Sequence, residues 1–287
     1  MTKANMQHSG SQHSLEVKAG SRFRFGENWS RFIDSIDESR LRMAEHSLAQ
    51  MLDCADLAGK AFLDVGSGSG LFSLAARRLG ARVRSFDYDP QSVACTAELR
   101  RRYFPDDADW VVEHGSVLDD RYLDTLGRYD IVYSWGVLHH TGHMWTALQN
   151  VARLPAPYGR LFIAIYNDQG RMSGHWLSVK RTYNRLPTSL RWFVLGPALV
   201  RLWGPTLLRD AVALQPFHSW RQYSAGSLRG MSAWRDVVDW VGGLPFEVAK
   251  PEQIFDFYRV RGFELVKMRT CAGGHGCNEY VFVAPGQ

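Results

Sequence analysis

The chain has 287 residues, 45% of them hydrophobic and 22% charged, which fits one large α/β domain or a core domain that carries a lid. Its four cysteines are few and scattered, and its longest apolar run, Trp192–Val200, is too short to span a bilayer, which argues against a disulfide framework and a membrane span. The net charge of +5 resides in short arginine groups such as Arg100–Arg102, without a basic tail. We interpret it as a solvated basic surface and expect a cytoplasmic protein without a nucleic-acid partner.

The N-terminal part divides into two segments. Residues 1–21 are polar, without hydrophobic periodicity, and predict a disordered tail. Residues 22–57 place apolar side chains at helical spacing and predict an N-terminal helical segment.

Between residues 58 and 166, short apolar runs alternate with amphipathic stretches. The predicted strands are Ala61–Val65, Arg82–Phe86, Asp109–Glu113, Tyr129–Ser134 and Arg160–Tyr166. The predicted helices between them are Leu71–Leu79, Pro90–Tyr103, a short one around Tyr122–Leu126, and Met144–Leu154. This alternation predicts right-handed βαβ units and a parallel sheet covered on both faces.

The alternation stops after Tyr166. Residues 167–250 are rich in Trp, Arg, Leu and Pro and predict a helical insertion, and residues 251–287 return to the core with strands at Phe263–Arg269 and Glu279–Ala284. An insertion of this length is typically functional, so we expect a lid over a pocket. Two alternatives are a face that rests on a membrane surface and admits a lipophilic, quinone-like acceptor, and an ordinary packed subdomain.

The most informative stretch is the turn Asp64–Gly70, read as DVGSGSG, between a strand and a helix. Its glycines allow a sharp bend and a close approach of a ligand, and the next helix offers free N–H groups. The dinucleotide-binding spacing is G-x-G-x-x-G, whereas here Leu71 stands where the third glycine would fall. The acid Asp64 disfavours a pyrophosphate and favours a cationic sulfonium ligand.

A second acid, Asp87, ends the second predicted strand. A carboxylate at this strand tip accepts hydrogen bonds from ribose hydroxyls. The alternative is a helix cap, a role that Asp89 fills better because it directly precedes Pro90.

Four stretches in order, FLDVGSGSG, VRSFDYDP, VEHGSVLD and YDIVYSWGVLHHTGHMWTALQNVARL, resemble a class I S-adenosylmethionine-dependent methyltransferase. The resemblance is to the quinone-biosynthesis (ubiquinone and menaquinone) enzymes and the methyltransferase type 11/12 group. It implies a Rossmann-like, seven-stranded, mostly parallel sheet with an antiparallel C-terminal strand. The implied cofactor-binding residues are Asp64, Gly66, Ser67, Gly68, Gly70, Asp87, Tyr88, Ser116, Val117, Ser134 and Trp135. The chain departs from the family at Pro157-Tyr158-Gly159, where the family has Pro-Gly-Gly.

Candidate catalytic residues follow the fourth and fifth strands. A hydroxyl nucleophile needs a base, and His139 or His140 could serve, with His140 favoured. Alternatively these histidines cap the next helix or line the pocket, and with His143 they lack the carboxylates that a hard cation needs, so we predict no metal. Tyr166, with Asn167 and Asp168, would orient a substrate or form an Asx-type turn.

Weaker candidates lie elsewhere in the chain. The stretch CAGGHGC is read as a hairpin connection with incidental thiols rather than a zinc site. Asn278 and Glu279 could reach the substrate side of the sheet, and Trp29 could stack at the cofactor's edge.

The sequence favours O-methylation of a small molecule. Methylation of carbon, nitrogen or RNA, a non-catalytic S-adenosylmethionine-binding module, and a nicotinamide oxidoreductase are the competing hypotheses.

Overall fold

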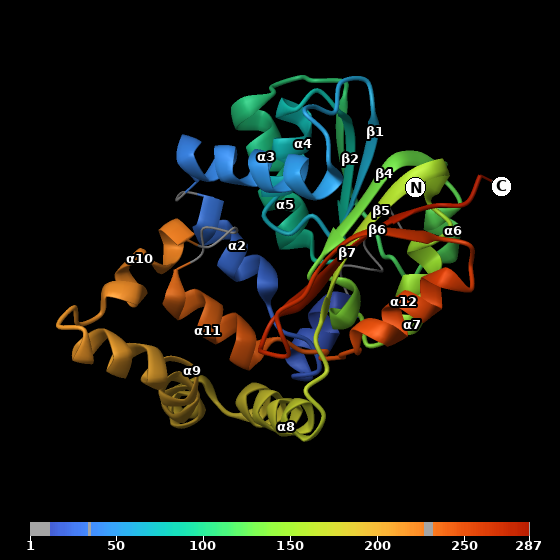
Figure 1. The fold of residues 1–287 in the computed structure, drawn as a ribbon. Helices are drawn as coiled ribbons and strands as arrows, with labels where there is room; N and C mark the ends of the chain where they lie inside the picture. Colours follow the sequence, from blue (N-terminus) through green and yellow to red (C-terminus); the bar gives the residue numbers. More distant parts are fainter. Residues whose placement is uncertain (1–11, 34–35, 227–231, 287) are drawn as a thin grey trace.

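The computed structural model describes residues 12–33, 36–226 and 232–286, and it holds a seven-stranded sheet between layers of helices (Figure 1). The strands are Ala61–Val65 (β1), Arg82–Asp87 (β2), Trp110–His114 (β3), Tyr129–Trp135 (β4), Pro155–Tyr166 (β5), Glu264–Arg269 (β6) and Cys277–Val283 (β7). The helices are Phe25–Ile33 (α2), Glu38–Leu52 (α3), Leu71–Arg78 (α4), Pro90–Tyr103 (α5), Asp120–Leu123 (α6), Met144–Val151 (α7), Arg171–Arg185 (α8), Trp192–Val212 (α9), His218–Gly226 (α10), Ala233–Gly242 (α11) and Pro251–Arg259 (α12). Two short 3-10 turns lie at Leu138–His140 and Thr188–Leu190.

The sheet has the order β3-β2-β1-β4-β5-β7-β6, in which β7 runs antiparallel to β5 and β6 and the other neighbours pair in parallel. This confirms the predicted α/β fold with its antiparallel C-terminal strand. In the sheet, β1 has β2 on one side and β4 on the other, so the order of the strands reverses next to β1. Such a reversal of strand order opens a crevice at the carboxyl ends of the strands, where α/β proteins bind ligands.

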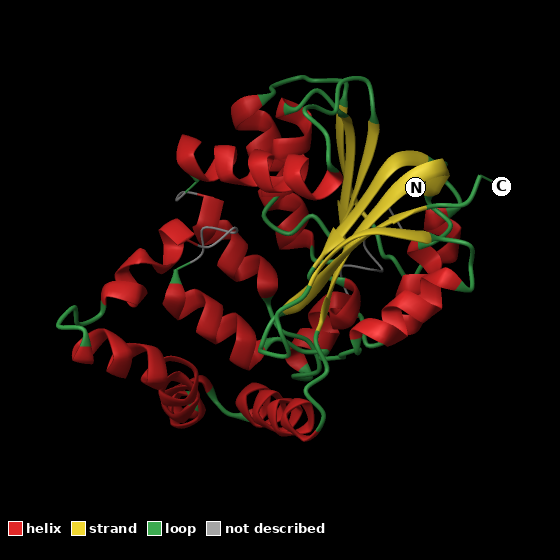
Figure 2. Ribbon diagram, in the orientation of Figure 1, coloured by secondary structure: helices red, strands yellow, loops and turns green. Residues whose placement is uncertain are grey.

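Alternating side chains of the central strands build two cores. Phe62 and Ile131 belong to the core under α3, α4 and α5, whereas Leu63 and Val132 belong to the core under α7 and α12. Figure 2 shows the sheet between these two helix layers. Tyr258 of α12 ties the second layer together, because its hydroxyl donates to a backbone carbonyl of α7 at 3.1 Å.

The described part of the N-terminal segment contacts the rest of the chain. Residues 12–18 are helical, although the sequence predicts a disordered tail over residues 1–21. Glu16 and Arg22 form an ion pair with 2.5 Å between Oε2 and Nε, and the Tyr88 hydroxyl donates to Glu16 at 3.3 Å. The contact with Tyr88 joins the segment to a residue 72 positions away, which no local pattern reveals. Residues 1–11 lie outside the described residues.

Strand β5 begins earlier than the sequence predicts. Pro155 pairs with Tyr129, ahead of an irregularity in the register of β4 and β5. Tyr158 stands where the family that the sequence resembles has a glycine, and its φ of 59° lies in the left-handed region. The unusual sequence at this position therefore strains the backbone locally, and the strand continues past it.

The insertion after β5 forms a helical layer beyond the carboxyl edge of the sheet, in which α11 lies beside α2 (Figure 1). It has its own small core around Trp176, Tyr183, Leu195 and Val237. Among the helices that the structure describes, none combines the length and the apolar content needed to cross a membrane.

Candidate functional site

The glycine turn after β1 is tightly packed. Gly66 and Gly70 have φ of +83° and +81°, which disfavour any other residue. A Cβ atom on Gly66 would lie 2.4 Å from Val137, and one on Gly70 would lie 2.8 Å from the backbone of Thr96. These two glycines are therefore required for close packing against neighbouring segments. Gly68, in contrast, faces the indole of Trp29, 3.3 Å from where its Cβ would stand.

Asp64 lies buried at the end of β1. Its Oδ2 accepts a hydrogen bond of 2.5 Å from the Ser73 hydroxyl, which lies 2.7 Å from the Ser85 hydroxyl. Burial raises the pKa of Asp64 to about 7, and the nearby charge of Asp87 acts in the same direction.

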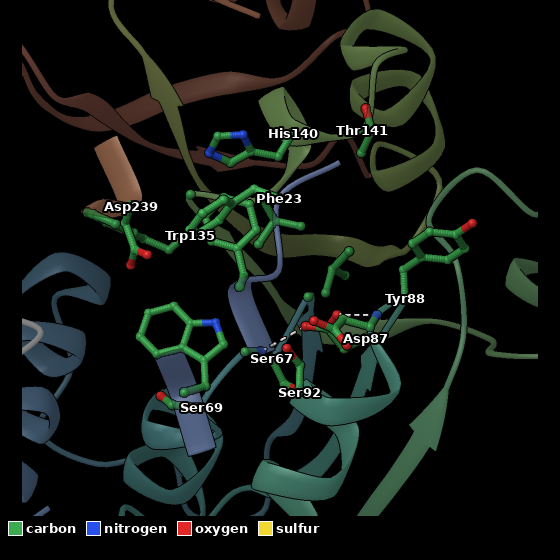
Figure 3. Close-up of a pocket in the computed structure, with 18 of the residues that line it drawn as sticks. Phe23, Ser67, Ser69, Asp87, Tyr88, Ser92, Trp135, His140, Thr141 and Asp239 are labelled. Carbon is green, nitrogen blue, oxygen red and sulfur yellow. Dashed lines mark hydrogen bonds between the residues drawn. The ribbon is translucent and has the colours of Figure 1, made fainter. Parts of the chain in front are cut away.

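Asp87 lies at the end of β2, facing the turn (Figure 3). Its two oxygens accept hydrogen bonds of 2.9 Å from the backbone N–H groups of Gly68 and Asp89. Burial, followed by repulsion from Asp89, raises the pKa of Asp87 to about 7. Asp89 caps α5 by accepting from Gln91 N, so the capping role that was an alternative for Asp87 belongs to Asp89.

The two acids border a cavity of about 1840 Å³. This volume exceeds the usual size of a pocket for one drug-sized ligand, so the cavity has room for two small molecules. The predicted residues that line it include Trp29, Asp64, Gly66, Ser67, Gly68, Asp87, Tyr88, Ser116, Val117, Trp135, His140 and Tyr166. Gly70, Ser134 and His139 are not among the described lining residues, and each has a packing or hydrogen-bonding role behind the wall.

Much of the opposite wall comes from segments in which the sequence singled out no individual site residue. In Figure 3, Ser67, Ser92 and Asp87 lie on one side of the cavity and His140 and Thr141 on the other. The additional lining residues include Glu16, Arg22, Phe23 and Phe25 near the N-terminus, and Leu202, Trp203, Thr206, Tyr223, Asp236, Asp239 and Trp240 from the insertion. These residues lie far apart along the chain and converge only through tertiary packing.

His140 is held from several sides. Its Nδ1 lies 2.6 Å from the carbonyl oxygen of Pro245, and its ring packs 4.9 Å from that of Phe25. The Arg22 guanidinium donates to the backbone carbonyl of His140 at 3.1 Å. His139 is fully buried, with its Nδ1 accepting from the backbone N–H of Tyr166 at 3.3 Å and its ring 3.9 Å from the Tyr166 ring. Of the two histidines, His140 is the one that reaches the cavity.

The remaining candidate residues mostly form hydrogen bonds between strands of the sheet or at the strand ends. The Ser134 hydroxyl donates to the carbonyl oxygen of Val65 at 2.9 Å, which joins β4 to β1. Glu279 accepts from the Trp135 indole at 2.9 Å and so orients a lining residue. Asn278 donates to the side chain of Asn167 at 3.0 Å, which fastens the β6–β7 hairpin to the end of β5.

Two further candidates are explained by local structure. Asp168 accepts from the backbone N–H of Gly170 at 2.8 Å, in the Asx-type turn that was one of its two interpretations. The Cys271 thiol donates to the carbonyl oxygen of Gly274 at 3.3 Å, within the hairpin connection.

A model of the methyltransferase domain family matches residues 36–203. The chain belongs to this family. It is a class I, S-adenosylmethionine-dependent methyltransferase, in agreement with the sequence motifs and the strand order.

Two curated relatives carry the name ubiquinone biosynthesis O-methyltransferase. The protein from Xanthomonas oryzae pv. oryzae is 34% identical over 112 residues, which are 39% of this chain and 45% of that protein. The protein from Rhodopseudomonas palustris is 28% identical over 164 residues, 57% of this chain and 59% of that protein. The methyltransferase thus matches about half the length of these curated relatives.

Solved structures agree on the fold. Magnesium protoporphyrin IX methyltransferase from Synechocystis PCC 6803, with bound S-adenosylhomocysteine, is similar at a TM-score of 0.52 and 15% identity, over 90% of this chain and 94% of that chain. At this identity the likeness concerns the fold.

The residues around the glycine turn fit S-adenosylmethionine, which carries ribose hydroxyls, a sulfonium and an ammonium group. Asp64 is buried and Asp87 is half-buried at the cavity, and among the described residues neither forms an ion pair with a lysine, arginine or histidine. Buried carboxylates require donors or positive charge, which such a ligand supplies. Gly66 and Gly68 line the cavity and present no side chain to it.

Proposed function

We propose that this methyltransferase transfers a methyl group to a hydroxyl of a small-molecule acceptor, with His140 as the base. The observation that carries the proposal is the position of His140, whose hydrogen bond to Pro245 fixes its ring in the cavity wall across from Asp64 and Asp87. In this proposal residues 58–166 hold the cofactor, and the insertion over residues 167–250 covers the acceptor.

The proposed cofactor contacts follow from the positions of the lining residues. Asp87 would accept the ribose hydroxyls, since its carboxylate already faces the turn at the end of β2. Ser116 and Val117 would flank the adenine, and Trp135 would lie beside the methionine part. When bound, S-adenosylmethionine supplies an electrophilic methyl group.

The role of His140 follows from its tautomer. A carbonyl oxygen only accepts hydrogen bonds, so the contact with Pro245 places the proton of the neutral ring on Nδ1. The lone pair is then on Nε2, which takes the proton from the acceptor hydroxyl as the oxygen bonds to carbon. Tyr166, with its ring 5.2 Å from that of His140, would orient the acceptor. The helices of the insertion would exclude water from the transfer.

A second candidate, N-methylation of an amine, is favoured by one feature of the wall. Asp236 and Asp239 of α11 line the cavity beside the aromatic side chains of Trp203, Tyr223 and Trp240. Carboxylates and aromatic faces together recognise cations. An amine acceptor would use this wall and would not need His140 as its base.

The test is to incubate the protein with methyl-labelled S-adenosylmethionine and fractionated cell extract. Label in an O-methyl product, lost in the variant His140→Ala, is the expected result. Label in an N-methyl product that survives His140→Ala would replace hydroxyl by amine as the acceptor group. Binding of S-adenosylhomocysteine without labelling of any fraction would overturn the enzyme proposal in favour of a binding module.

A further inference from the structure

The outward face of α9 is apolar. Phe193, Val200, Leu208 and Val212 are 57%, 70%, 67% and 78% exposed. Two exposed prolines of the same helix lie between them, and together these residues follow one side of the helix at roughly helical spacing. A surface helix of a globular protein shows the opposite pattern, with polar residues outside.

The apolar face continues beyond both ends of the helix. Leu190 and Trp192 precede it with 42% and 61% exposure, and Leu214 and Phe217 follow it with 88% and 53%. Eight of the eighteen exposed large apolar side chains in the described chain thus lie within residues 190–217. Such a concentration marks an interaction surface rather than scattered exposure.

The core does not account for this face. Leu195 and Ala198 are the buried apolar residues of α9, and they pack on the inner side. Leu202, Trp203 and Thr206 line the cavity. The helix lies at the margin of the molecule, away from the sheet (Figure 1). Its outer face is therefore left for an external partner.

The surroundings of the apolar face are basic. Residues 171–226 contain eight lysines and arginines and one acid, Asp210. Their net positive charge therefore exceeds that of the whole chain. Asp210 is buried, and it accepts hydrogen bonds from the hydroxyl and the backbone N–H of Ser219 at 2.7 and 2.8 Å. Arg201 and Arg209 are exposed on α9 itself.

We propose that this face, residues 190–217, docks on a membrane surface that contains anionic lipids. Tryptophan, phenylalanine and leucine insert at the boundary between headgroups and acyl chains, and arginines attract anionic headgroups. A second copy of the chain is disfavoured as the occupant, because a symmetric contact would bring the same arginines together.

Docking in this way would place one wall of the cavity against the bilayer. Trp203 and Thr206, on the inner side of α9, would then lie between the lipid surface and the cavity. The acceptor would be a lipid-soluble molecule, a consequence that rests on the proposed function. The docking itself does not depend on methyl transfer and is measured without it.

The experiment is co-sedimentation of the full chain with vesicles of phosphatidylcholine alone and of phosphatidylcholine mixed with phosphatidylglycerol. We expect binding to the anionic vesicles that weakens at high salt. Val200→Asp should weaken this binding by about tenfold or more, because it places a negative charge on the docking face. The matched control is Val260→Asp, since Val260 is also 70% exposed but lies just after α12. It should bind like the unmodified protein.

Arg201→Gln with Arg209→Gln is the second variant, which removes charge without adding a buried group, and it should also bind more weakly. S-adenosylhomocysteine binding by each variant confirms folding and separates this test from that of the proposed function. Equal binding to both kinds of vesicle, no binding to either, or equal loss in Val260→Asp would overturn the proposal. A dimer that Val200→Asp dissociates, seen by sedimentation velocity without vesicle binding, would assign the face to self-association instead.

Discussion

The Nδ1 atom of His140 lies 2.6 Å from the carbonyl oxygen of Pro245, and this contact decides which ring nitrogen carries the proton. Pro245 lies 105 positions away, and Arg22, which donates to the carbonyl oxygen of His140, lies 118 positions away. The orientation of His140 therefore depends on the N-terminal segment and on the end of the insertion. Both segments must be folded against His140 before its ring is oriented for the proposed role as a base.

Replacement of the proposed base tests this arrangement. His140→Ala should lower turnover by about 10²- to 10⁴-fold, the usual contribution of a general base. The dissociation constant for S-adenosylhomocysteine should change little, because Asp87 and the glycine turn are untouched. His143→Ala is the control, since His143 also lines the cavity but is exposed. Equal turnover of the two variants would remove His140 from the mechanism.

The proposed ribose contact predicts a different pattern. Asp87→Ala should weaken binding of S-adenosylhomocysteine by about 1–3 kcal/mol, the scale of a hydrogen bond to a charged group. Calorimetric titration measures this loss. Asp256→Ala changes an exposed carboxylate of α12 and should leave the affinity unchanged. An unaffected dissociation constant in Asp87→Ala would contradict the site.

The raised pKa values of Asp64 and Asp87 predict a pH dependence of cofactor binding. Burial raises the pKa of both Asp64 and Asp87 to about 7 in the ligand-free protein, with Arg22 opposing the shift at Asp87 and Ser73 opposing it at Asp64. A cationic ligand binds the ionised carboxylates, so affinity should fall as the pH falls below about 7, by up to about tenfold per pH unit for each titrating group.

Titration calorimetry in two buffers of different ionisation enthalpy measures the released protons directly. We expect proton release on binding of S-adenosylmethionine near pH 6 and little release near pH 8. Asp64→Asn should reduce that release. Binding with no proton release on either side of pH 7 would show that these carboxyls are already ionised in the free protein.

The sequence predicted the parts of the molecule that depend on local signals. The turn Asp64–Gly70 and the acid at the end of β2 follow strand patterns that need only neighbouring residues to be recognised, and β1 and α5 have the predicted bounds. The second wall of the cavity depends on tertiary contacts. Arg22 and Asp239 line it because the N-terminal segment meets the end of the insertion there, and neither residue carries a local signature.

Some residues were predicted for the site because they follow the right strands. Ser134 is the last residue of the predicted strand but the penultimate residue of β4, and its side chain donates to the carbonyl of Val65 rather than facing the cavity. A one-residue difference along a strand reverses the face that a side chain occupies, and the sequence pattern does not fix this at a fully buried strand. His139 and His140 are also neighbours, in the 3-10 turn that follows β4, yet only His140 is among the described lining residues.

The glycine turn offers a final prediction with a matched control. Gly66 and Gly127 have φ of +83° and +79°, but a Cβ would lie 2.4 Å from Val137 at Gly66, whereas no described heavy atom lies within 4 Å at Gly127. Both Gly66→Ala and Gly127→Ala carry the cost of a left-handed residue, about 1–2 kcal/mol. Gly66→Ala should lose a further 1–3 kcal/mol or so of unfolding free energy through overpacking.

Chemical denaturation measures the two losses, and calorimetry should show weaker S-adenosylhomocysteine binding in Gly66→Ala alone, because the turn must shift away from Val137. The double variant Gly66→Ala with Val137→Ala removes the atoms that the new methyl group meets. It should recover part of both losses, since the coupling between the two positions is steric. Equal losses for Gly66→Ala and Gly127→Ala would mean that backbone conformation alone, and not the contact with Val137, requires glycine at the turn.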